Sequence, residues 1–224
     1  MLSHPKFYQH TKKWTAKDMP DALWPTDNDE GIPLLRLDLQ ADAVDLPVVQ
    51  WGTVRRTRPM TGTWSFYVDD YRFNRLWQDP SAVLNSACIN VVEPNFSVGL
   101  NTPRAVALYQ IYRKRWLARL WQEFRGIRVF VDLNVARRYA QENLLGVPPG
   151  WRAYATRGSS RYLDDLDFEY GLACEKRGNE DILFVVYGGN RETQKHAQAR
   201  GWIWLMEQQD AMKNREDVAE RLAL

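Results

Sequence analysis

Two acidic residues stand at the ends of two strongly predicted strands. Glu93 follows the apolar, β-branched run at residues 87–92, and Asp132 closes a second such run at residues 127–132. The carboxyl ends of neighbouring parallel strands meet at one edge of a sheet, so these two carboxylates should lie close together. Such a pair could hold a divalent cation or divide the roles of general acid and general base. The alternative is that each carboxylate caps a helix or pairs with a nearby arginine, and the sequence leaves both readings open.

A glycine-rich turn is expected at the same edge of the sheet. It consists of Gly188, Gly189, Asn190 and Arg191 and follows the most apolar run of the chain. Its backbone amides could bind a phosphate, with Arg191 as the clamp, although the spacing is not that of a dinucleotide or P-loop motif. A plain strand-to-helix turn is the other explanation. The polar residues expected at this edge are Glu93, Asn95, Asp132, Asn134, Arg157, Ser159, Ser160 and the four residues of the turn.

Basic residues gather in three places, of which the smallest is Arg137-Arg138 at the start of a predicted helix. Four occur within seven positions of one predicted helix, and three share one loop. They are Arg113, Lys114, Arg115 and Arg119 in the helix, and Arg55, Arg56 and Arg58 in the loop. Cationic side chains can bind phosphates, and the neighbouring aromatic rings of Tyr112, Trp116 and Trp121 can stack on bases. The patches therefore predict contact with nucleic acid, and a solvated helix face is the alternative.

Several other chemistries find no support in the sequence. His4, His10 and His196 form no i, i+4 pair, which argues against a histidine-ligated zinc site. Cys88 and Cys174 sit in apolar segments at no metal-ligand spacing, so we expect two reduced core thiols. A run of acids at Asp164, Asp165, Asp167 and Glu169 occupies the first turns of a predicted helix, where negative charge favours the helix dipole. No metal site is predicted there, and no serine elbow, kinase motif set or Cys–His pair occurs.

The best-defined element is the helix that joins the two acid-ended strands. Thr102 is expected to cap it, Pro103 to take its first position and Gly126 to end it. Its apolar positions recur at helical spacing and should face a sheet. They are Val106, Tyr109, Trp116, Leu120 and Phe124. Two strands joined by such a helix form a parallel crossover unit, expected to be right-handed.

The remaining segments alternate in the same way. Further strands are predicted at 33–38, 47–51, 64–68, 151–156, 182–187 and 202–206, about eight in all. Further helices are predicted at 71–77, 136–145, from Ser159 or Ser160 to Gly178, 192–200 and 210–222. We therefore expect an α/β fold with a mostly parallel sheet and helical crossovers, either open and doubly wound or barrel-like. Residues 1–31 form an irregular N-terminal arm, expected to dock through Trp14 and Trp24, and residues 32–224 form one domain.

The central unit also carries a family resemblance. Its segments are Val92-Glu93-Pro94-Asn95-Phe96-Ser97, Thr102-Pro103-Arg104-Ala105, Tyr112-Arg113-Lys114-Arg115, Gln122 and Gly126-Ile127-Arg128-Val129. They resemble the signature of domain-of-unknown-function family 4417, which is scattered through bacteria, plasmids and phages. Asn95 stands where the family pattern has an aspartate. The resemblance runs from about residue 87 to residue 188 and implies a mobile genetic element as habitat, without an established activity.

Composition sets the outer bounds on function. The net charge of +2 gives no global reason to wrap nucleic acid, so any basic surface has to be local. No apolar run long enough for a membrane span and no signal peptide occur, which predicts a cytoplasmic protein. The leading hypothesis is a mobile-element protein that contacts nucleic acid or a nucleoprotein complex. The alternatives are an enzyme on a phosphorylated or nucleotide substrate, with Glu93, Asp132 and Arg191 in the working roles, and an effector that binds a host protein through its N-terminal arm.

Overall fold

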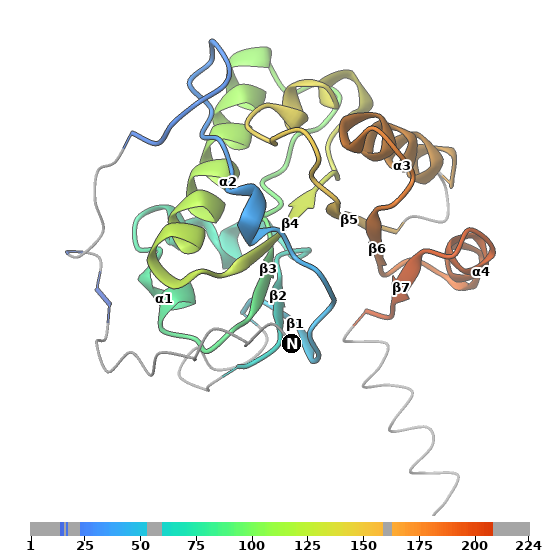
Figure 1. Ribbon diagram of the computed structural model, residues 1–224, viewed down its shortest axis with the longest axis horizontal. Coiled ribbons are helices and arrows are strands. Elements are labelled where there is room, and N and C mark those ends of the chain that lie inside the picture. Colours follow the sequence, from blue (N-terminus) through green and yellow to red (C-terminus); the bar gives the residue numbers. More distant parts are fainter. Residues whose placement is uncertain (1–13, 16, 18–22, 53–59, 159–162, 208–224) are drawn as a thin grey trace, which may run out of the picture.

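Seven parallel strands form the sheet in the part of the chain that the structure describes. The computed structural model describes residues 14, 15, 17, 23–52, 60–158 and 163–207 (Figure 1). The strands are β1 (Val48–Gln50), β2 (Thr63–Ser65), β3 (Asn90–Val92), β4 (Arg128–Asp132), β5 (Ala153–Arg157), β6 (Leu183–Tyr187) and β7 (Ile203–Leu205). Every neighbouring pair is parallel. The predicted α/β class with a parallel sheet is confirmed.

The strands lie side by side in their order along the chain, from β1 to β7. In a doubly wound sheet the order of the strands reverses at a switch point. The strand order of this sheet never reverses. It curls instead into a half-barrel (Figure 1). Of the two predicted arrangements, the barrel-like one is right and the doubly wound one is wrong.

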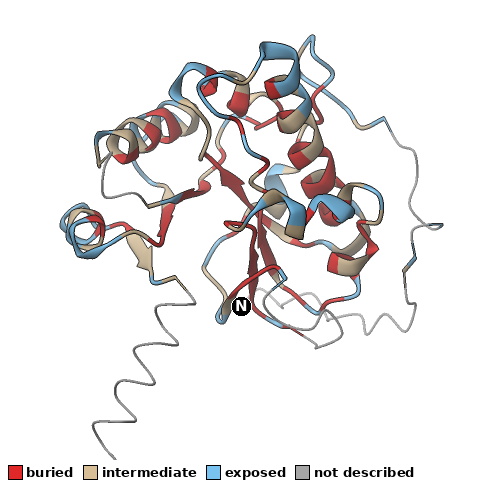
Figure 2. Ribbon diagram, turned by 180° about the vertical axis from the view of Figure 1, so that it is seen from behind, coloured by how far each residue is buried: buried red, intermediate tan, exposed pale blue. Residues whose placement is uncertain are grey.

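The helices pack on the outer face of the half-barrel. They are α1 (Ser81–Leu84), α2 (Arg104–Arg125), α3 (Leu163–Arg177) and α4 (Arg191–Ala199). Alternate residues of a strand point to opposite faces. In β4, Val129 and Val131 therefore join helix residues such as Leu120 in the main core, and Phe130 joins a second cluster on the inner face. The strands are accordingly buried along most of their length (Figure 2).

The inner face is a filled core and not an open channel. Tyr67 and Tyr187 stack across it with ring centroids 5.7 Å apart, over apolar residues such as Val92 and Phe130. The hollow that remains among these side chains has a volume of about 10 Å³. That volume is enough for about one water molecule. The inner face thus resembles the packed interior of a closed (β/α) barrel.

Helix α2 ends as predicted but begins differently. Gly126 takes the left-handed conformation (φ 62°) and donates its N–H to the Gln122 carbonyl. At the other end Pro103 is the N-cap, and the Thr102 hydroxyl instead accepts a hydrogen bond of 2.9 Å from the Gly99 N–H. The predicted capping role of Thr102 is therefore wrong, because its side chain closes the preceding turn.

The apolar face predicted for α2 is only partly buried. Trp116 and Leu120 lie in the core and Phe124 packs against it, as expected. Val106 and Tyr109 are 44% and 49% exposed. Their predicted burial is wrong, and the first two turns of the helix leave an apolar strip at the surface.

Three segments differ in type from the prediction. Residues 33–38 form no strand, because the Leu35 amide bonds to the Gly146 carbonyl and the Arg36 amide to the Gln122 side chain. The predicted helices 71–77 and 136–145 are each a pair of short 3-10 helices. These are η3 (Asp70–Arg72) and η4 (Asn74–Trp77), then η5 (Arg137–Tyr139) and η6 (Glu142–Leu144). A further 3-10 helix, η2 (Leu37–Leu39), begins within the segment 33–38. The predicted helix 210–222 lies outside the described residues.

Two tryptophans of the N-terminal arm pack on the body. The Trp14 ring lies 5.1 Å from that of Phe124, and the Trp24 ring lies 6.3 Å from that of Trp116. The Trp14 peptide is held by Asn85, which accepts from its N–H at 2.8 Å and donates to its carbonyl at 2.7 Å. The described part of the arm is docked, as the two large apolar side chains suggested.

Replacing Asn85 with alanine should loosen this attachment. The variant loses both hydrogen bonds to Trp14, so the Trp14 amide should exchange with solvent roughly fivefold faster, as expected for about 1 kcal/mol. Hydrogen exchange followed by NMR measures this directly. Gln198→Ala, on the exposed face of α4, is the control and should leave the rate as it is. Equal exchange in Asn85→Ala and the parent protein would show that the side chain does not hold the arm.

Candidate functional site

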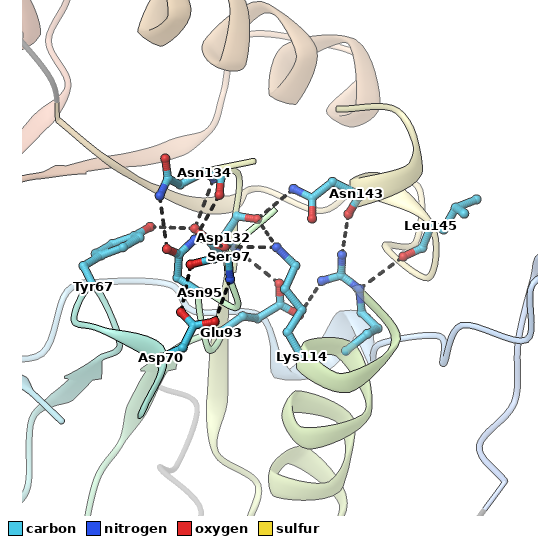
Figure 3. A network of polar contacts seen from close by, with 11 residues as sticks. Tyr67, Asp70, Glu93, Asn95, Ser97, Lys114, Asp132, Asn134, Asn143 and Leu145 are labelled. Carbon is cyan, nitrogen blue, oxygen red and sulfur yellow. Dashed lines mark hydrogen bonds and ion pairs between the residues drawn. The ribbon is translucent and has the colours of Figure 1, made fainter. Parts of the chain in front are cut away.

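Two buried ion pairs link the ends of β3 and β4 to the middle of α2 (Figure 3). The Arg115 guanidinium pairs with the Glu93 carboxylate, and the Lys114 ammonium lies 3.0 Å from Asp132 Oδ2. All four side chains are at most 1% exposed. The two acids predicted to meet at the edge of the sheet do so, since Glu93 Oε2 accepts the Asp132 N–H at 3.2 Å.

Polar neighbours occupy the remaining sites on Asp132. Its Oδ1 accepts from the Tyr67 hydroxyl at 3.1 Å and from the Asn134 N–H at 3.1 Å, and its Oδ2 also accepts from the Asn95 amide at 2.9 Å. Burial, with the charge of Asp132 beside it, raises the pKa of the Tyr67 phenol well above its usual value, which keeps this donor protonated. A buried carboxylate is tolerated only when it is neutralised and hydrogen-bonded in this way.

The cationic partners also hold the segment after β4. Arg115 donates to the carbonyl groups of Asn143 (2.6 Å) and Leu145 (3.1 Å), while Lys114 and Asn143 both donate to the Asp132 carbonyl. The network therefore joins α2, two strand ends and the η6 loop into one unit. Of the two alternatives that the sequence left open for Glu93 and Asp132, the structure shows the second, in which each acid pairs with a nearby cation.

The basic residues of α2 do not form the surface patch that the sequence predicted, because these contacts bury two of them. Lys114 and Arg115 were expected at a nucleic-acid surface, and both are buried. Arg113 lies over the Phe96 ring at 3.9 Å, and Arg119 donates to the Leu34 carbonyl and pairs with Glu123. The prediction is wrong for Lys114 and Arg115, because two carboxylates inside the fold supply the partners that the sequence pattern placed in solvent.

The glycine turn after β6 is held by the sheet and by α4, and its Gly188 N–H donates to the Leu205 carbonyl at 2.8 Å. Asn190 caps α4, and its side-chain oxygen accepts from the N–H groups of Glu192 (2.9 Å) and Thr193 (3.2 Å). Gly188 and Gly189 adopt positive φ, and a Cβ at either would clash with Glu207 or Thr193. Close packing requires these glycines, which supports the strand-to-helix turn; the phosphate cradle stays a prediction, and Arg191 is exposed.

Glu169 of α3 is a buried acid whose role the sequence reading missed. Burial, reinforced by the charges of Asp132 and Asp165, raises the pKa of its carboxyl to about 8. Its Oε2 makes no hydrogen bond with any described residue. The signal was available in the sequence, because position 169 falls on the apolar helix face between Leu166 and Ala173. It had been assigned to the acidic first turns instead.

Exposed arginines line the carboxyl-terminal edge of the sheet. They come from the segments that follow β3, β4 and β6 and from the last residue of β5. The set is Arg104, Arg137, Arg138, Arg157 and Arg191, called the edge arginines below. Arg137 and Arg157 face acids at 4.0 and 3.5 Å, and Arg104 approaches Glu30 and Glu142. Exposed pairs of this kind contribute little to stability.

Some predicted residues lie outside the described ranges. They are the basic loop residues Arg55, Arg56 and Arg58, the capping candidates Ser159 and Ser160, and His4 and His10. Within the described ranges, no three His, Cys, Asp or Glu side chains form a group that could hold a metal ion. Cys88 and Cys174 are free thiols. None of the described helices combines the length and apolar character needed to cross a membrane.

Comparison with known proteins connects the chain to phages. A family model described as "Domain of unknown function (DUF4417)" matches residues 24–200, well beyond the segment 87–188 that carried the resemblance. The "Gene 1 protein" of Mycobacterium phage L5 is 37% identical over 132 residues, which are 57% of each chain. That of Mycobacterium phage D29 is 39% identical over 132 residues, 57% of this chain and 48% of the relative. The chain thus spans about half the length of the curated relatives it matches, and no solved structure matches it.

Proposed function

Because this chain belongs to the DUF4417 family and is related to mycobacteriophage proteins, we propose that it contacts nucleic acid through the edge arginines. The observation that carries the proposal is their placement: segments following β3, β4 and β6, and the end of β5, each direct an arginine toward the same edge. This is the edge at which α/β sheets usually bind their ligands. Arginine is suited to phosphate because its planar fork donates two parallel hydrogen bonds.

The alternative of an enzyme using Glu93 and Asp132 has less support. Both carboxylates are 0% exposed and already bound to cations, so neither faces a substrate. Arg191 lies at the start of α4 and, within the part of the chain that the structure describes, pairs with neither acid. Contact with a phosphate backbone needs only exposed cations in register, which this edge provides.

Salt dependence of binding should identify the edge arginines as the contact. Each phosphate contact releases counterions, so Arg157→Ala/Arg191→Ala should reduce the slope of log K against log salt by up to about 2. Fluorescence anisotropy with single- and double-stranded DNA and RNA, over a salt series, gives the slope for each ligand.

The matched control removes two arginines from the opposite edge. Arg128 begins β4 and Arg152 precedes β5, so Arg128→Ala/Arg152→Ala has the same net charge as the test variant. This control should keep the parent slope. If the two double variants behave alike, or if the parent binds none of the four ligands at low salt, the edge is not a nucleic-acid contact.

A further inference from the structure

A cavity of about 170 Å³ lies beside the ends of β1 and β2. It is lined by Trp51, Arg72, Arg75, Leu76, Asp79 and Ala82. One water needs about 10–15 Å³ in this measure, and sites for drug-sized ligands are about 300–1,000 Å³. The cavity therefore suits a small group, such as one phosphate with its waters, and not a whole nucleotide.

The two arginines of the cavity differ from most arginines of the described chain. Most described arginines lie within 4 Å of an acid, as Arg128 does with Asp42 and Arg157 with Glu207. Arg72 and Arg75 form no ion pair with any described residue. They are one turn apart, on η3 and η4, so both guanidinium groups can reach one ligand.

Neighbouring residues fix the position of Arg72. Gly52 follows β1 with φ +85°, and a Cβ there would lie 3.5 Å from the Arg72 side chain. The backbone at Gly52 therefore lies beside the stem of the Arg72 side chain. On its other side the guanidinium lies 5.7 Å from the centroid of the Tyr71 ring. An arginine held by a backbone and an aromatic ring, without an acid, is preorganised for an anion.

The one acid of the cavity is partly engaged elsewhere. Asp79 Oδ1 accepts hydrogen bonds from the N–H and the hydroxyl of Ser81, at the start of α1. The cavity therefore keeps one net positive charge from two arginines and one aspartate. Trp51, 1% exposed, adds an apolar aromatic wall.

We propose that this cavity is a binding pocket for one phosphate group, held between Arg72 and Arg75. It is a discrete concave site and does not depend on the edge arginines. The phosphate can be a free ion or the terminal phosphate of a nucleic acid, because both present the same oxygens to two guanidinium forks.

Isothermal titration calorimetry with inorganic phosphate at low ionic strength tests the pocket. The full chain should bind one phosphate saturably, and Arg72→Ala/Arg75→Ala should weaken binding about tenfold or more. Arg75→Ala alone, at an exposed position, gives a second variant that should fold like the parent. The charge-matched control Arg128→Ala/Arg152→Ala, at the opposite edge of the sheet, should bind phosphate within about twofold of the parent. Absence of saturable binding, or equal loss in the control, overturns the pocket.

A second experiment identifies the source of the phosphate. Single-stranded oligonucleotides with a 5′-phosphate or a 5′-hydroxyl are compared in the parent and in Arg72→Ala/Arg75→Ala. A preference for the 5′-phosphate that the double variant loses supports a nucleic-acid end as ligand, and no preference supports the free ion. Loss of phosphate binding with an unchanged salt slope for nucleic acid separates the pocket from the edge arginines.

Discussion

Replacing Arg115 with methionine is expected to lower the free energy of unfolding by about 3–5 kcal/mol. The substitution leaves the Glu93 carboxylate fully buried without its cation and frees the carbonyl groups of Asn143 and Leu145. Removal of one partner from a buried pair costs the desolvation of the other, which is far more than an exposed pair contributes. Urea unfolding followed by circular dichroism gives the free energy of unfolding.

Two further variants make this result specific to the buried pair. Glu93→Leu/Arg115→Met removes both charges and should recover a large part of the loss, because no lone charge remains. Arg119→Met, one turn away on α2, breaks a partly exposed pair with Glu123 and a hydrogen bond to the Leu34 carbonyl, and should cost less, about 1–2 kcal/mol. If Arg115→Met is no less stable than Arg119→Met, the guanidinium does not stabilise Glu93 as described.

Stability should fall with rising pH because of Glu169. Its carboxyl has a pKa of about 8 in the folded protein, against 4.5 when unperturbed. Between these values the folded state keeps a proton that the unfolded state has released, so the favourable contribution is complete below about pH 4.5 and is lost as the pH approaches 8. At 1.36 kcal/mol per pH unit, the loss is up to about 5 kcal/mol across this window.

Glu169→Gln isolates this effect. Glutamine mimics the neutral acid and does not titrate, so the variant should gain on the parent steadily from pH 5 to about pH 8. Glu175→Gln, on an exposed position of the same helix, should follow the parent curve. Urea unfolding at a series of pH values measures all three proteins. Parallel curves for Glu169→Gln and the parent would mean that Glu169 is ionised in the folded state.

The fold was largely readable from the sequence because its signals are local. Apolar runs ended by polar residues located β3 to β7, and Gly126 and Gly178 marked the ends of α2 and α3. The 3-10 pairs were missed because a short run with helical composition cannot be told from a single tight turn without its tertiary contacts. Thr102 was misassigned for a similar reason, since its hydroxyl closes a turn that precedes the helix.

The candidate site was only half readable. The meeting of Glu93 with Asp132 follows from the parallel sheet, and the sequence predicted it. The burial of Lys114 and Arg115 could not be inferred, because a charged pair on a helix predicts solvent unless the acids facing it are known. Whether Lys114 and Arg115 are buried depends on which side of α2 faces the strand ends, and packing across the whole sheet sets that orientation.

The sequential order of the strands also bears on how this chain reaches its native state. Each strand pairs with the strand before it in the sequence, so during synthesis every new strand–helix unit can add to an edge that is already formed. Contacts between consecutive units keep the loops that must close short, which favours fast assembly. Tyr67 and Tyr187 are an exception, since Tyr67 follows β2 and Tyr187 ends β6, and their rings meet only when the curled sheet is nearly complete. Their stacking should therefore form late, and substitutions there should speed unfolding more than they slow folding.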